Sequence, residues 1–166
     1  YTIDWGDGTS ESVTTTDNID HTYEKAGMYL ITISGSFTNG IVVGTSSNTN
    51  KNKMIEVYGG SNYPTTISGN AFANCTRLTE AIFPSATSIG QFGFDNCTSL
   101  TTANFPLVTS ISAGGFRGCT RLTEAIFPSA TSISFSNFFG GCTSLTTVHL
   151  PRATSIGPNV FSGCTS

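Results

Sequence analysis

The hydrophobic positions of the chain recur with a period of about 22 residues over its second half. Phenylalanine lies three positions before each cysteine, and leucine lies three positions after each of the first four cysteines. Five positions after that leucine comes an aromatic residue or a second leucine, followed by proline. A period in the range of roughly 20 to 29 residues predicts a solenoid, because one coil cannot bury its own apolar side chains without neighbours. The cysteines that mark the period are Cys75, Cys97, Cys119, Cys142 and Cys164.

Within each unit, the segment LTEAIFP and its counterparts predict a short strand with alternating faces. In the first copy, the side chains expected to point inward are those of Leu78, Ala81 and Phe83. Those expected to point outward are Thr79, Glu80 and Ile82. Pro84 ends the strand because it has no N–H for a continued ladder. We expect the stretch from Ile89 to Cys97 to return on the convex side as turns or a short helix.

One segment, CTRLTEAIFPSATSI, occurs twice without change, at Cys75–Ile89 and at Cys119–Ile133. A related type beginning CTSLTT occupies residues 97–111 and 142–156. The unit that was copied is therefore a pair of coils. This pattern indicates the growth of an array rather than a catalytic requirement.

These units resemble the BspA-like leucine-rich repeats of bacterial surface proteins, which read approximately I-G-x-x-A-F-x-x-C-x-x-L-x-x-V-x-L-P. The similarity covers about residues 67–166, and MIEVYGG at 54–60 fits an irregular first strand. The resemblance implies a secreted or surface-anchored protein that binds other proteins or host material without catalysis. The central strand position departs from the family pattern, which predicts a thinner core or a different inward neighbour. The residues that depart are Ala81, Ala103 and Ala125.

The amino-terminal stretch IDWGDGTSES followed by HTYEKAGMYLITISG resembles the polycystin-type (PKD) Ig-like domain, with its W-x-F-G-D-G-T and H-x-Y-x-x-x-G-x-Y motifs. Gly-Asp-Gly supplies a tight turn between strands. The resemblance implies a spacer or adhesion module without its usual first strand. The matching residues are Trp5, Gly6, Asp7, Gly8, Thr9, His21, Tyr23, Gly27 and Tyr29.

The predicted fold class is therefore mainly β. A small Ig-like, PKD-like β-sandwich, truncated at its N-terminus, is expected over residues 1–52. A leucine-rich-repeat solenoid with a parallel sheet on one face is expected over residues 53–166. The boundary follows a change of charge balance: residues 1–50 carry six acids and one base, whereas the remainder carries four acids and six bases. Because a strand opens the sequence and a further repeat begins at its end, we expect a piece of a longer chain.

Charge and hydropathy exclude two classes of partner. Only 10% of residues are charged, the formal net charge is −3, and lysine and arginine form no cluster, so a nucleic-acid surface is not expected. No segment approaches the ~18 consecutive apolar residues of a membrane span. Membrane insertion of this sequence is not expected either, and we expect an extracellular or cell-surface location.

Few residues suggest chemistry. Asp4, Asp7 and Glu11 surround a glycine turn but lack the D-x-D-x-D-G spacing of a calcium loop, which favours a structural turn. His21 and His149 fall in different predicted domains, so a shared metal or acid–base pair is not expected. No G-x-S-x-G, phosphate loop or C-x-x-C is present, and no catalytic residue, metal or cofactor is predicted.

The five cysteines share one phase of the repeat, which orients their side chains in one column rather than toward one another. Buried cysteine behaves as a small apolar residue. We expect free, buried, structural thiols.

The outward strand positions are the candidate ligand-binding surface. Isoleucines among threonine and glutamate on an open sheet favour protein or glycan binding, with host extracellular matrix as one candidate. The alternative is a surface that only keeps the array soluble, since a tailored site seldom repeats itself. The candidate residues are Thr79, Glu80, Ile82, Thr101, Thr102, Asn104, Thr123, Glu124, Ile126, Thr146, Thr147 and His149.

Three functions fit these patterns. The first is a non-enzymatic bacterial surface or secreted protein that mediates adhesion through the repeat sheet. The second is an accessory binding region of a larger secreted hydrolase, because PKD-like modules often adjoin catalytic domains. The third is a structural spacer. The ligand and the oligomeric state stay open at this point.

Overall fold

The structure of the chain, a computed structural model, describes residues 2–14, 24, 32–34, 56–58, 66–133 and 135–166. It divides into two compact units, Tyr1–Phe37 and Thr38–Ser166, and each is described by itself. The predicted boundary near residue 52 lies outside the described residues and stays a prediction. Every regular element among the described residues is a β-strand, in agreement with the mainly β prediction.

The first unit contains an antiparallel sheet of three strands in the order β2-β1-β3, with β1 at Thr2–Asp4, β2 at Ser10–Ser12 and β3 at Thr32–Ser34. Gly6 and Gly8 have φ of 76° and 92°, the left-handed region that glycine adopts without steric cost. The Asp7 carboxylate accepts hydrogen bonds from the N–H and the hydroxyl of Thr9, at 3.0 and 2.6 Å. The predicted turn is therefore confirmed. His21, Tyr23, Gly27 and Tyr29 lie outside the described residues, so the PKD-like sandwich stays a prediction.

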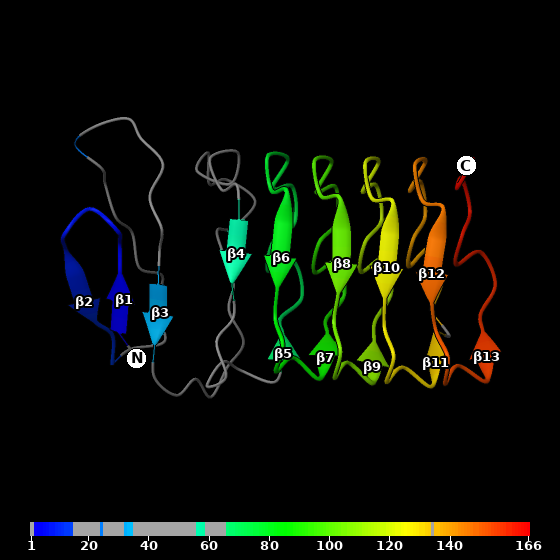
Figure 1. Cartoon of the computed structure of the whole chain (residues 1–166), viewed down its shortest axis with the longest axis horizontal. Helices are drawn as coiled ribbons and strands as arrows, with labels where there is room; N and C mark the ends of the chain where they lie inside the picture. The colour runs from blue at the N-terminus through cyan, green and yellow to red at the C-terminus, as the bar shows by residue number, and fades with distance from the viewer. Residues whose placement is uncertain (1, 15–23, 25–31, 35–55, 59–65, 134) are drawn as a thin grey trace. The chain divides into compact units, whose positions relative to one another are not determined.

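The second unit contains a parallel sheet of five strands in the order β12-β10-β8-β6-β4, which Figure 1 shows side by side. Neighbouring strands pair in register, one coil apart, as a solenoid requires. The strand predicted at LTEAIFP is thereby confirmed. The five strands are β4 (Glu56–Tyr58), β6 (Glu80–Ile82), β8 (Thr102–Asn104), β10 (Glu124–Ile126) and β12 (Thr147–His149).

A second set of strands, absent from the expectation, runs along another side of the coils (Figure 1). Each has two residues and contains the isoleucine that was expected to begin the return. They form a three-stranded sheet, β5-β7-β9, and a two-stranded sheet, β11-β13. The strands are β5 (Thr66–Ile67), β7 (Ser88–Ile89), β9 (Ser110–Ile111), β11 (Ser132–Ile133) and β13 (Ser155–Ile156).

After Ile89, which belongs to β7, the return to Cys97 consists of turns, one of the two forms expected. Its backbone bonds to the next coil: the N–H of Phe94 donates to Gly115 O at 2.8 Å, and that of Asn96 to Arg117 O at 2.7 Å. The residue before each cysteine has a left-handed φ of 56° to 77°, which explains why only asparagine and glycine occupy it. These residues are Asn74, Asn96, Gly118, Gly141 and Gly163.

Aromatic rings form the core in two columns. Phe94 and Phe116 stack with centroids 5.0 Å apart, and Phe105 and Phe127 stack at 5.6 Å, with both columns fully buried at these coils. The central alanines of β6, β8 and β10 stay inward, so the inward neighbour is unchanged: Ala103 and Ala125 are 0% exposed. These alanines belong to the same buried cluster as the phenylalanine rings.

The thiols form the predicted column of free cysteines, buried in the first four coils and partly exposed at Cys164 in the last. The last four donate to the carbonyl of a phenylalanine in the preceding coil, for example Cys119 Sγ to Phe94 O at 3.2 Å and Cys142 Sγ to Phe116 O at 3.1 Å. Burial raises the pKa of the Cys142 thiol to about 12 and that of Cys119 well above its ordinary range. The thiols therefore stay protonated near neutral pH, which suits packing rather than metal binding or nucleophilic chemistry.

Alkaline pH should destabilise the solenoid through these thiols. Because the folded pKa of Cys142 lies above its ordinary value of 9.0, the folded state holds the proton more tightly. This contribution is fully present below pH 9 and is lost as pH rises toward about 12. In urea titrations from pH 8 to pH 11, the unfolding free energy of Cys142→Ala should decline less steeply than that of the wild type. Equal slopes would contradict the linkage.

Candidate functional site

The outward residues of β6, β8, β10 and β12 fall into two straight rows, because the strands pair in register and side chains alternate between faces. A third row precedes the strands. The isoleucine row is Ile82, Asn104, Ile126 and His149. The carboxylate row is Glu80, Thr102, Glu124 and Thr147. The threonine row is Thr79, Thr101, Thr123 and Thr146.

The predicted outward orientation is confirmed by burial. Ile82 is 37% exposed, whereas the neighbouring Ala81 and Phe83 are 2% and 3% exposed. Asn104 and His149 are exposed, and Ile126 is half-buried. An exposed isoleucine beside an exposed amide gives a ligand both van der Waals contact and hydrogen bonds. Whether these residues bind a ligand stays a prediction.

The threonine row has a structural role that the sequence did not show. The hydroxyl of Thr101 donates to Thr79 O at 3.3 Å, and the hydroxyls of Thr123 and Thr146 donate to the threonine carbonyl one coil earlier at 3.1 Å each. Their O–H groups therefore connect neighbouring coils. The isoleucine row and the carboxylate row are therefore the stronger candidates for ligand contact.

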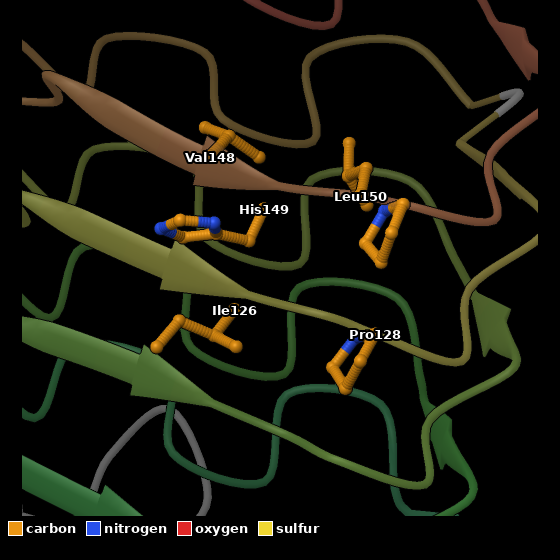
Figure 2. Close-up of a pocket in the computed structure, with 6 residues that line it drawn as sticks. Ile126, Pro128, Val148, His149 and Leu150 are labelled. Atoms are coloured by element: carbon orange, nitrogen blue, oxygen red, sulfur yellow. The ribbon is translucent and has the colours of Figure 1, made fainter.

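The rows end in a shallow depression at β12, where Ile126 and His149 lie side by side on neighbouring strands (Figure 2). His149 Nε2 lies 3.4 Å from Glu124 Oε1, and both side chains are about half exposed. The candidates predicted from the outward strand positions did not include the prolines Pro128 and Pro151 or the residues Val148 and Leu150 at the edge strand. The proline that follows each strand takes the next outward position, and this alternation would have found Pro128. The lining residues are Ile126, Pro128, Val148, His149, Leu150 and Pro151.

A second polar cluster lies on the return. Arg117 donates from Nε and Nη2 to the two carboxylate oxygens of Asp95 at 2.6 and 3.0 Å. The guanidinium carbon lies 4.7 Å from the centre of the Phe92 ring. The hydrogen bond to Asp95 raises the pKa of Arg117. Because Asp95 is only 6% exposed, this cluster holds two coils together rather than presenting a site.

The stability losses from removing the two partners of this ion pair should not be additive. Arg117→Met leaves the buried Asp95 carboxylate with the amide of Asn96 at 3.1 Å, and should lower the unfolding free energy by about 1–3 kcal/mol. The double variant Arg117→Met with Asp95→Asn should lose less than the sum of the two single changes. Urea titration of the four proteins measures this coupling, and strict additivity would show that the two side chains do not interact.

Metal-ligating residues do not gather in the part of the chain that the structure describes: no three of its His, Cys, Asp and Glu side chains lie together. Asp4 instead accepts the N–H of Gly6 at 2.8 Å within the amino-terminal turn. His21 lies outside the described residues. Within those residues, no helix is long and apolar enough to cross a membrane.

Coils of about 22 residues with parallel strands on one side and buried leucines define a leucine-rich-repeat solenoid. The family described as the BspA type leucine rich repeat region matches residues 47–166 in six copies, and the chain belongs to this family. The predicted resemblance is thereby confirmed for the repeats. The match leaves residues 1–46 outside it, and the PKD-like resemblance stays a prediction.

Two crystal structures are similar to the chain. The leucine rich repeat protein of T. pallidum is 32% identical with a TM-score of 0.61, over 68% of this chain and 56% of that one. A leucine rich cell surface protein from Faecalibacterium prausnitzii is 30% identical with a TM-score of 0.56, over 66% of this chain and 36% of that one. The chain therefore spans about half and about a third of their lengths. No curated protein matches the chain in a sequence comparison.

Proposed function

We propose that the chain is part of a non-enzymatic cell-surface or secreted protein that mediates adhesion by binding a partner protein through the outward face of its five-stranded sheet. The observation that carries this proposal is the isoleucine row. Ile82 is 37% exposed on a regular strand, while the inward positions of the same strand are buried. Exposed apolar side chains on a rigid sheet are typical of interaction surfaces.

Family membership supports the surface location. The similar structure from Faecalibacterium prausnitzii is a leucine rich cell surface protein. Extracellular matrix proteins and glycans are accordingly the first ligands to screen. No cofactor is part of the proposal.

We also propose that residues 1–52 form a PKD-like module that holds the repeats away from the cell. The turn at Trp5–Thr9, closed by the N–H of Trp5 donating to Thr9 O at 3.0 Å, supports this assignment. The antiparallel order β2-β1-β3 is also the arrangement expected of an Ig-like sheet.

Binding of the purified chain to immobilised matrix proteins and glycans tests the adhesion proposal. Saturable binding is expected, and Ile82→Asp with Ile126→Asp should weaken it by about tenfold or more, since two charges would enter an apolar contact. Leu107→Asp is the matched control, because Leu107 is 51% exposed outside the sheet and its change should leave binding unaltered. Binding that survives the double change, or no saturable binding at all, would favour a spacer.

A further inference from the structure

The outward face of the sheet repeats every two coils. Because Cys75–Ile89 and Cys119–Ile133 are identical, Glu80 and Ile82 on β6 recur as Glu124 and Ile126 on β10. Strand β8 lies between them and pairs with both in register. Neighbouring strands lie about 4.8 Å apart, so equivalent side chains lie about 9.6 Å apart along the solenoid. The face therefore holds two half-sites of identical sequence at a fixed spacing, and Glu124 of the second also lies 3.4 Å from His149 Nε2.

This spacing selects among ligand backbones that lie across the strands. A polyproline II segment has three residues per turn and rises about 3.1 Å per residue, so every third residue recurs after about 9.3 Å. An extended strand presents the same face every ~6.8 Å, and an α-helix has a pitch of about 5.4 Å. Of the three regular backbones, polyproline II fits the half-sites closely.

The charge of the sheet face and the hydrogen bonds that it can donate also favour a polyproline II ligand. The outward strand positions from β6 to β12 carry two carboxylates, at Glu80 and Glu124, and no lysine or arginine. A ligand with a cation at every third residue would meet one carboxylate per turn. Polyproline II makes no internal hydrogen bonds, so its carbonyls need donors. The exposed amide of Asn104, on the strand between the half-sites, lies where it can supply one.

From this match of period, charge and donor, we propose that the sheet binds a polyproline II segment of its partner, lying across the strands, with a basic side chain at every third residue. The basic residues meet Glu80 and Glu124, the intervening residues contact Ile82 and Ile126, and Asn104 bonds to the ligand backbone. This inference rests on the proposed function, because it names the ligand of the same face.

Three fluorescein-labelled peptides test the inference by anisotropy at low ionic strength. The first consists of five Pro-Pro-Lys triplets, the second has the same composition with its lysines at every other position so that no two lie three residues apart, and the third consists of five Pro-Pro-Glu triplets. The first should bind in a saturable manner and about fivefold or more tighter than the second, which cannot engage both half-sites at once. The third should not bind. Equal affinity for the first two peptides would overturn the inference, because charge alone would then explain binding.

Substitutions on the sheet test whether the peptide binds to this face. Glu80→Gln with Glu124→Gln should weaken binding of the Pro-Pro-Lys peptide about three- to tenfold, as expected for two exposed charges. Asn104→Ala should weaken it further, whereas Glu11→Gln, exposed in the other unit, should have no effect.

The outcomes separate this inference from the proposed function. A matrix protein that binds through Ile82 and Ile126, together with no binding of the Pro-Pro-Lys peptide, would overturn the inference and leave adhesion standing. Failure of both the peptide and the matrix screen would overturn both.

Discussion

Phe116→Ala should lower the unfolding free energy by about 3–5 kcal/mol, the usual cost of truncating a buried phenylalanine. The ring is fully buried and stacks on Phe94 at 5.0 Å and on Phe139 at 6.0 Å. Its loss opens a gap in the middle of a column, which neighbouring coils cannot close without breaking the register of their strands. Chemical denaturation followed by circular dichroism measures the change.

The matched control for this prediction is the same substitution at an exposed ring one coil later. Phe135 is 52% exposed, so Phe135→Ala should change stability by less than about 0.5 kcal/mol. Similar losses for the two variants would mean that the aromatic columns do not hold the coils together.

Excision of residues 75–118 should give a shorter chain that still folds. The junction joins Asn74 to Cys119, and because the two copies are identical it restores the native sequence and the phase of every column. The excised chain should also carry Ala71→Gly, since the Phe138 ring packs against Gly115, whose place Ala71 would take. Two coil interfaces are lost, so the melting temperature should fall on the order of 10 °C.

An excision out of phase provides the control. Removing residues 75–107 deletes one and a half coils and joins Asn74 to Val108, which places apolar and polar positions on the wrong sides. That chain should not fold cooperatively. An in-phase chain that unfolds as readily as this control would show that the pair of coils is not the structural unit. The in-phase chain should also bind ligand more weakly, because it keeps one half-site.

Much of the repeat region was predictable from local pattern. The alternation in LTEAIFP placed Ala81 inward and Ile82 outward, and the single phase of the cysteines predicted their column, since both depend on periodicity alone. The outward rows also followed once the coils were taken to stack in register. Periodicity is sufficient here because each coil contacts only its neighbours.

Other features depend on contacts made by residues that depart from the repeat pattern. Phe92 has a φ of 57° at a position where other coils have asparagine or glycine. Its ring packs against Gly114 and beneath Arg117 of the next coil. These two contacts accompany the exception, and the repeat pattern alone does not predict them. The strands of two residues, such as β7, were missed because two residues are too few to show alternation.

Central to this interpretation is that each coil buries its phenylalanine, leucine and cysteine side chains against its neighbours. The outward rows of the sheet are then left to contact a partner. Alkylation of the native chain by iodoacetamide at pH 8, read residue by residue by mass spectrometry, tests this burial most directly. Cys97, Cys119 and Cys142 are 0% exposed and should stay unmodified until the chain unfolds, while the partly exposed Cys164 should react. Rapid modification of Cys97, Cys119 and Cys142, or of the equally buried Cys75, in the native chain would contradict the stacked column and, with it, the assignment of the outward rows.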